Sequence, residues 1–116
     1  MNLKLELPWP PTANTYWRRN GARYFISKSG QEYRRSVYFI CHAFRGMFHS
    51  DNRLKVTILA YPPDKRKRDL DNLGKACMDS IQYAKVFEDD SQIDELTFKR
   101  MPEFLSKIIV SIEVIQ

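Results

Sequence analysis

The 116-residue sequence lacks several features that would assign a protein to a common functional class. No apolar run approaches the roughly 20 residues that cross a bilayer, and the start of the chain, which alternates leucine with charge, has no signal-peptide core. We therefore expect a cytoplasmic protein with no membrane partner. The four glycines form no phosphate-binding loop. The two cysteines, Cys41 and Cys77, form no CxxC pair and fall in apolar helical stripes, which predicts buried, reduced thiols.

Histidine is equally scarce, and its placement argues against zinc. His42 and His49 are seven residues apart and have no cysteine motif near them. No Ser-His-Asp arrangement suggests itself. An EF-hand loop aligned on Asp69 also fails, because its twelfth position is Ser80 rather than glutamate.

The charge of the chain is unevenly distributed. The whole sequence has a formal net charge of +5. Residues 1–50 hold eight basic and two acidic side chains, a net +6, whereas residues 51–116 hold eleven basic and twelve acidic ones, a net −1. A basic field suits a polyanion such as nucleic acid, although solvated surface charge explains the net charge equally well.

Hydrophobic periodicity predicts an α+β fold in which two helices pack on a mixed sheet with a short N-terminal hairpin, all in one domain over residues 1–116. Alternation predicts strands at about 2–7, 56–61, 93–101 and 108–114. Asn20-Gly21 predicts a hairpin over 16–26 with a type I′ turn. The second helix is expected from about Asp69 to Ala84.

The first helix is expected to begin at a capping box formed by Ser29 and Glu32 and to close near Gly46. Spacings of three and four residues predict that its apolar face consists of Tyr33, Val37, Ile40, Cys41, Phe44 and Phe48.

The most informative segment is Lys65-Arg66-Lys67-Arg68-Asp69-Leu70-Asp71, where four consecutive cations stop at two acids. Helix capping by Asp69 and a favourable dipole interaction of Asp71 would explain these acids individually. Two further acids, Asp89 and Asp90, recur before the next strand. They could converge with the first pair if the strand ending at Tyr61 and the strand starting near Ile93 are neighbours.

Converging carboxylates would favour a bound cation. Two of them about 4 Å apart repel by about 4 kcal/mol at an effective dielectric near 20. Oxygen ligands without His or Cys suit Mg²⁺ or Mn²⁺, and such a site beside cations favours phosphodiester hydrolysis. Lys75, one turn after Asp71, could hold that carboxylate, position water or neutralise charge in the transition state; alternatively it forms an ordinary surface pair.

Two basic segments are candidates for DNA binding. The hairpin places Arg18, Arg19 and Arg23 among aromatic residues, although a plain surface hairpin is at least as good an interpretation. The run Lys65, Arg66, Lys67 and Arg68 is expected to contact phosphates or to anchor the loop before the acids.

The order and spacing of the motifs resemble those of RusA-type Holliday-junction resolvases. These motifs are LPWPP, Asn14-x-Tyr16-x-Arg18, Tyr33-Arg34, the run RKRDLDNLGKACMD and DDSQI. The resemblance implies a homodimeric, Mg²⁺-dependent endodeoxyribonuclease that acts on branched double-stranded DNA. It also implies that Asp69, Asp71 and Asp90 are the catalytic, metal-binding acids, that Lys75 is essential, and that Asp89 is a supporting acid.

Two other functions stay open at this point. One is a non-catalytic nucleic-acid-binding module whose acids only cap and solvate. The other is a metal nuclease that acts on different branched DNA, such as flaps or forks.

Overall fold

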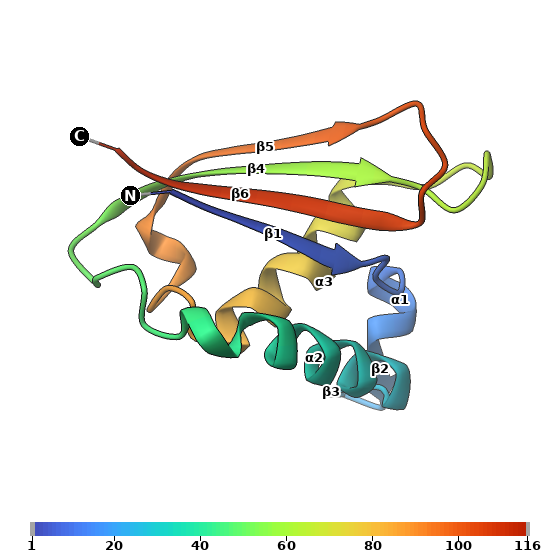
Figure 1. Cartoon of the computed structure of the whole chain (residues 1–116). Coiled ribbons are helices and arrows are strands. Elements are labelled where there is room, and N and C mark those ends of the chain that lie inside the picture. The colour runs from blue at the N-terminus through green and yellow to red at the C-terminus, as the bar shows by residue number, and fades with distance from the viewer. Residues whose placement is uncertain (1, 116) are drawn as a thin grey trace.

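The computed structural model describes residues 2–115 and contains a four-stranded sheet with helices on one face (Figure 1). Its strands are β1 (Asn2–Pro8), β4 (Arg53–Tyr61), β5 (Ile93–Arg100) and β6 (Lys107–Ile115), in the order β1-β6-β4-β5. β4 and β5 are parallel, whereas β6 is antiparallel to both β1 and β4. The predicted α+β class with a mixed sheet is confirmed.

The core lies between the sheet and two helices, α2 (Lys28–Cys41) and α3 (Leu70–Tyr83). Every second residue of β1, β4 and β6 is buried, as the alternation in the sequence predicts. The thiols of Cys41 and Cys77 are free and buried between the helices and the sheet, also as expected. Of the helices within residues 2–115, none combines the length and the hydropathy of a membrane span.

Helix α2 begins earlier and ends earlier than the sequence indicated. Its N-cap is Ser27, whose hydroxyl accepts a hydrogen bond from the backbone N–H of Gly30 at 3.0 Å, so the predicted cap at Ser29 is wrong. The chain leaves the α-helix after Cys41 and forms a short 3₁₀ helix, η1 (His42–Phe44). Ile40 was expected on the apolar face but is 39% exposed, because the core contacts of α2 follow Tyr33, Val37 and Cys41.

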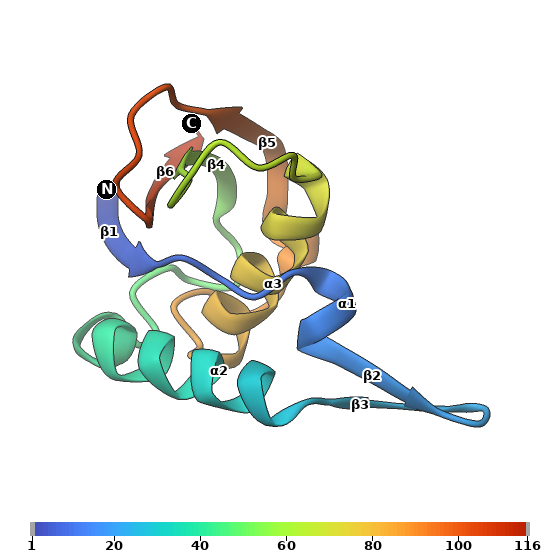
Figure 2. The ribbon, with the colours of Figure 1, turned by 90° about the vertical axis from the view of Figure 1, so that its right-hand side faces the viewer.

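The N-terminal hairpin forms where expected, from β2 (Trp17–Asn20) and β3 (Arg23–Ile26), and projects from the body of the molecule (Figure 2). Its turn differs from the prediction. The two central residues are Gly21 and Ala22, and only Gly21 has a positive φ, of 64°. Glycine at the first central position fits a type II′ turn rather than type I′. A short helix that the sequence analysis missed, α1 (Ala13–Tyr16), precedes the hairpin.

The strand directions decide which loops lie together. The register pairs Pro8 with Lys107, Lys107 with Tyr61, and Ala60 with Arg100, so the ends of β1, β4 and β5 lie at one edge of the sheet with the start of β6. Helix α3 begins after the end of β4, at this same edge. The start of β5, where Ile93 pairs with Leu54, lies at the opposite edge.

Candidate active site

Asp69 occupies the N-cap position of α3 in an extended conformation, but its side chain makes no capping hydrogen bond. The Asn72 side-chain amide donates to its Oδ2 at 3.4 Å, a long contact. The sequence therefore correctly predicted that Asp69 lies at the N-cap position, but its side chain does not cap the helix. The Asp69 carboxylate stays exposed to solvent and free to take a ligand.

Asp71 and Lys75 follow Asp69 on the first turns of α3. A hydrogen bond with Asp71, and then the negative charge of Asp71, raise the pKa of Asp69 above its ordinary value, while the charges of Lys75 and Arg100 act in the opposite direction. The cause is the closeness of the two carboxylates, since each negative charge opposes the ionisation of the other. A cation between them would relieve that repulsion, so this pair fits Mg²⁺ or Mn²⁺, which bind through one or two carboxylates together with water and phosphate.

Asp90 does not join this pair within one chain. β4 and β5 are neighbours, as the convergence hypothesis required, but they run parallel, so the end of β4 and the start of β5 lie at opposite edges. Asp90 begins the 3₁₀ helix η2 (Asp90–Gln92) before β5. It lines a cleft of about 540 Å³ together with Lys75, Asp79 and Asp94. Within residues 2–115 of a single chain, no three His, Cys, Asp or Glu side chains are grouped as a metal site.

Asp89 stabilises the loop that contains Asp90. As the N-cap of η2, Asp89 accepts a hydrogen bond from the Gln92 backbone N–H on its own carbonyl at 3.1 Å, and its carboxylate accepts from the Ser91 hydroxyl. The Ser91 hydrogen bond is the main cause of the lowered pKa of Asp89. The Gln92 side chain, which is buried, accepts from the Asp89 backbone N–H at 3.0 Å and donates to the carbonyl of His49 at 2.8 Å. These contacts hold η2 against the α2–β4 connection, an anchoring role for Gln92 that the sequence analysis missed.

The hairpin brings two of its three predicted arginines close to α3. Arg18 and Arg19 line a cleft of about 580 Å³ together with Asn72 and Lys75 of α3. Arg19 also donates from Nε to the Gly21 carbonyl at 2.6 Å and lies 5.5 Å from the centre of the Tyr24 ring. Arg23 is exposed beside the turn, where it pairs with Asn20.

The predicted DNA-binding run divides into two parts. Arg68 is an anchor: its guanidinium donates to the Asp64 carboxylate at 2.8 Å and to the Asp64 carbonyl at 3.0 Å. It also lies over the Trp9 ring at 5.5 Å, and its side chain is only 15% exposed. Lys65, Arg66 and Lys67 remain exposed at the surface of the same loop.

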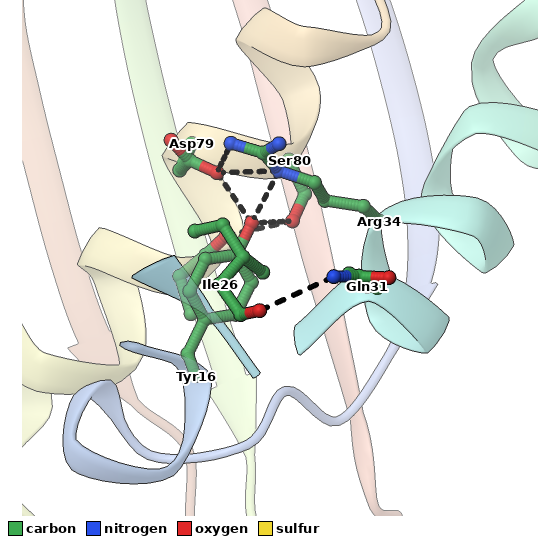
Figure 3. A network of polar contacts seen from close by, with 7 residues as sticks. Tyr16, Ile26, Gln31, Arg34, Asp79 and Ser80 are labelled. Atoms are coloured by element: carbon green, nitrogen blue, oxygen red, sulfur yellow. Dashed lines mark hydrogen bonds and ion pairs between the residues drawn. The ribbon is translucent and has the colours of Figure 1, made fainter. Parts of the chain in front are cut away.

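A polar network that the sequence analysis did not identify joins α1 and α2 to α3 (Figure 3). Arg34 of α2 forms an ion pair with Asp79 of α3 at 2.8 Å and donates to the Tyr16 hydroxyl at 2.9 Å. Tyr16 in turn donates to Asp79. Tyr16 and Arg34 belong to the motifs noted above, but only the fold shows that both meet Asp79.

Comparison with known proteins places this arrangement in a family. A family model described as endodeoxyribonuclease RusA matches residues 8–113. The chain belongs to the RusA family. The match covers the hairpin, α3 and η2, and therefore every candidate side chain described above. The family membership confirms the resemblance recognised in the sequence motifs.

Named relatives of the RusA family support the same assignment. The chain is 44% identical over 90 residues to a crossover junction endodeoxyribonuclease of Enterobacteria phage HK97, covering 78% of this chain and 75% of the relative. It is 39% identical over 98 residues to that of Enterobacteria phage 82 and 38% identical over 98 residues to that of Escherichia coli strain K12; each of these matches covers 84% of this chain and 82% of the relative.

Proposed function

We propose that this RusA-family protein is a Mg²⁺-dependent endodeoxyribonuclease that resolves four-way DNA junctions by paired, symmetric phosphodiester hydrolysis. One observation carries the proposal: the Asp69 carboxylate, free of any capping bond, lies beside Asp71 at the start of α3. The relatives' names, which specify crossover junctions, support four-way DNA as the substrate.

Asp69 and Asp71 would hold the divalent cation, either Mg²⁺ or Mn²⁺, since both accept carboxylate ligands together with water and phosphate. When bound, such a cation activates water and neutralises charge on the scissile phosphate. Lys75 lies between the two acids and the cleft that contains Asp90. Its ammonium is therefore positioned to stabilise negative charge that develops on the phosphate.

Asp90 is the third acid of the proposal, and Asp89 supports it through the fold of η2. Asp90 would approach the ion from the cleft that it lines together with Lys75. A titration with Mn²⁺ separates these roles. Asp71→Asn should abolish binding of the ion to the free protein. Asp90→Asn should weaken binding of the ion only when Asp90 binds the same ion as Asp69 and Asp71.

The hairpin arginines and the exposed part of the basic run would position the DNA. Arg18 and Arg19 share a cleft with Lys75, so a backbone bound between the hairpin and α3 runs past the catalytic lysine. Arg23, Lys65, Arg66 and Lys67 are exposed for further phosphate contacts, while Arg68 maintains the loop. Such contacts carry affinity without reading bases.

We propose a homodimer because resolving a junction requires two incisions at symmetric phosphates, and one chain supplies one pair of adjacent acids. A twofold axis brings a second copy of the site to the related strand. It also doubles the net charge of +5, which helps to gather the arms of the junction. The proposal includes a cytoplasmic location, since the DNA substrate is found there.

The decisive experiment uses a plasmid with an extruded cruciform. With Mg²⁺, the dimer should give linear product by two incisions within one binding event, and without a divalent cation it should give none. A monomer in light scattering, or nicked circles as the sole product, would rule out paired incision. Binding without cleavage at any divalent concentration would favour the non-catalytic module. Preferential cleavage of flaps or forks would favour a different branched substrate.

A further inference from the structure

A third cleft lies at the edge of the sheet where α3 begins. It has a volume of about 510 Å³ and is lined by three loops that are far apart in the sequence. These loops are the Pro8–Trp9 exit of β1, the connection between β4 and α3, and the connection between β5 and β6. The last two are joined at 3.3 Å by a hydrogen bond from the Ser106 backbone N–H to the Pro62 carbonyl. The volume lies within the ~300–1,000 Å³ range of small-ligand sites.

The lining of this cleft combines aromatic rings with positive charge. Phe104 is 56% exposed, although it is large and apolar. Trp9 also lines the cleft, half-buried beneath the Arg68 guanidinium. The remaining lining includes Lys65, Lys67 and Arg100.

The single acid of the cleft does not cancel this charge. Asp64 accepts from the Arg66 backbone N–H at 3.0 Å and forms a 2.8 Å ion pair with Arg68. The rim therefore stays strongly basic beside an exposed ring.

This chemistry favours one occupant over the others. A second copy of the chain would bring the same cluster of cations against this one, so like charges oppose self-association here. Duplex DNA satisfies the cations but offers no free base face, because its bases are stacked on each other. An unpaired nucleotide satisfies both features, since its base can stack on an aromatic ring while its phosphates meet lysine and arginine.

The cleft also adjoins the catalytic acids. Arg100 lines the cleft and donates at 2.5 Å to the carbonyl of Arg68, the residue directly before Asp69. A nucleotide held here would therefore lie next to the phosphate presented to Asp69 and Asp71.

We propose that this cleft binds an unpaired nucleotide flanking the incision, with its base stacked on Phe104 and its phosphates held by Lys65, Lys67 and Arg100. This inference rests on the proposed function for the identity of the DNA. It adds a subsite that discriminates between unpaired and paired DNA next to the cleavage point.

The test compares single-stranded with duplex oligonucleotides in EDTA, so that cleavage plays no part. In fluorescence anisotropy, Phe104→Ala should weaken binding of an oligothymidine about tenfold, as expected for the loss of one base–aromatic stack, and change duplex binding less than twofold. Phe104→Trp should retain the affinity. Phe39→Ala is the matched control, because Phe39 is 73% exposed but lies on α2 in a different cleft.

A second readout locates the base. In a four-way junction carrying 2-aminopurine next to the crossover, wild-type protein and Phe39→Ala should quench the fluorescence, and Phe104→Ala should not. The proposal is overturned if Phe104→Ala matches Phe39→Ala in both assays, or if it weakens single-stranded and duplex binding equally. These measurements need no cleavage, so they are independent of a failure of the junction-resolving function itself.

Discussion

Arg34 on α2 and Asp79 on α3 form an ion pair, with an Nη2–Oδ2 distance of 2.8 Å, that links the two helices. The side chains are 24% and 30% exposed, and the Arg34 guanidinium also lies 4.5 Å from the centre of the Tyr83 ring. Burial alone would lower the pKa of Arg34, but the hydrogen bonds to Asp79 and Tyr16 raise it above its ordinary value. The Arg34 guanidinium therefore stays protonated beside the Asp79 carboxylate.

Asp79→Asn should destabilise the fold, because it keeps the size of the side chain but leaves Arg34 without its opposite charge. We expect the free energy of unfolding in urea to fall by about 1–3 kcal/mol. Asp94→Asn is the control, since it breaks the exposed pair with Arg53 and should cost at most about 1 kcal/mol. Equal losses for the two variants would show that the Arg34 pair has no special structural role.

The raised pKa of the Tyr16 hydroxyl leads us to expect that the free energy of unfolding falls at alkaline pH. Burial, reinforced by the hydrogen bond to Asp79, raises the pKa of Tyr16 to about 12 from 10.0. The folded state thus holds this proton more tightly than the unfolded state. Its contribution is complete below pH 10 and is lost as the pH rises towards 12. Tyr16→Phe should show a shallower decline of unfolding free energy over that interval, and an unchanged slope would contradict the assignment.

Asp71→Asn should abolish cleavage while leaving junction binding intact or tighter, because a metal ligand and a charge that repels the DNA backbone are both removed. Removing that charge should also move the pKa of Asp69 down towards its ordinary value. Millimolar Mg²⁺ should raise the melting temperature of the wild type but not that of the variant.

Asp51→Asn makes the same change of charge at an exposed site on the α2–β4 connection, and it should retain activity and the response to metal. Cleavage by Asp71→Asn at the wild-type rate would contradict the assignment of Asp71 as a metal-binding acid.

The two parts of the basic run should respond differently to substitution. Replacing Lys65 and Lys67 by alanine should reduce the magnitude of the log K against log[salt] slope by about 0.9 for each phosphate of the duplex arms that is no longer neutralised. Arg68→Ala should instead lower the melting temperature, because it removes the interactions with Asp64 and Trp9. If the lysine variant keeps the wild-type slope, the side chains of Lys65 and Lys67 do not contact the phosphates of the DNA.

Gly74→Ala should destabilise the protein even though alanine is the better helix former by about 1 kcal/mol. A Cβ at this position would lie less than 3.0 Å from three atoms of the Phe98 ring on β5. In a Phe98→Ala background the obstruction is gone, so the same substitution should become stabilising. An identical effect of Gly74→Ala in both backgrounds would mean that the close approach of α3 to β5 does not require glycine.

Local patterns were enough to locate most of the elements. Alternating burial in β1, β4 and β6 follows the alternating sequence, and α3 runs from Leu70 to Tyr83 between caps at Asp69 and Ala84, within one residue of the prediction. The errors were also local in kind. Ser27 and Ser29 can each cap a helix. Ser27 is the N-cap in the structure, and its hydroxyl also donates to the Thr15 carbonyl of the neighbouring α1.

The sequence by itself determined that Asp71, Lys75 and Asp79 share one face of α3, because a spacing of four residues stacks side chains on any α-helix. It also indicated the chemistry of the candidate site, because the carboxylates of Asp69 and Asp71 follow directly on four cations. Only the tertiary structure decided which distant residues meet. The parallel pairing of β4 and β5 separates Asp90 from Asp69, and the packing of α2 on α3 brings Arg34 to Asp79. Strand direction and helix packing depend on how the whole chain buries its apolar faces, which no local spacing encodes.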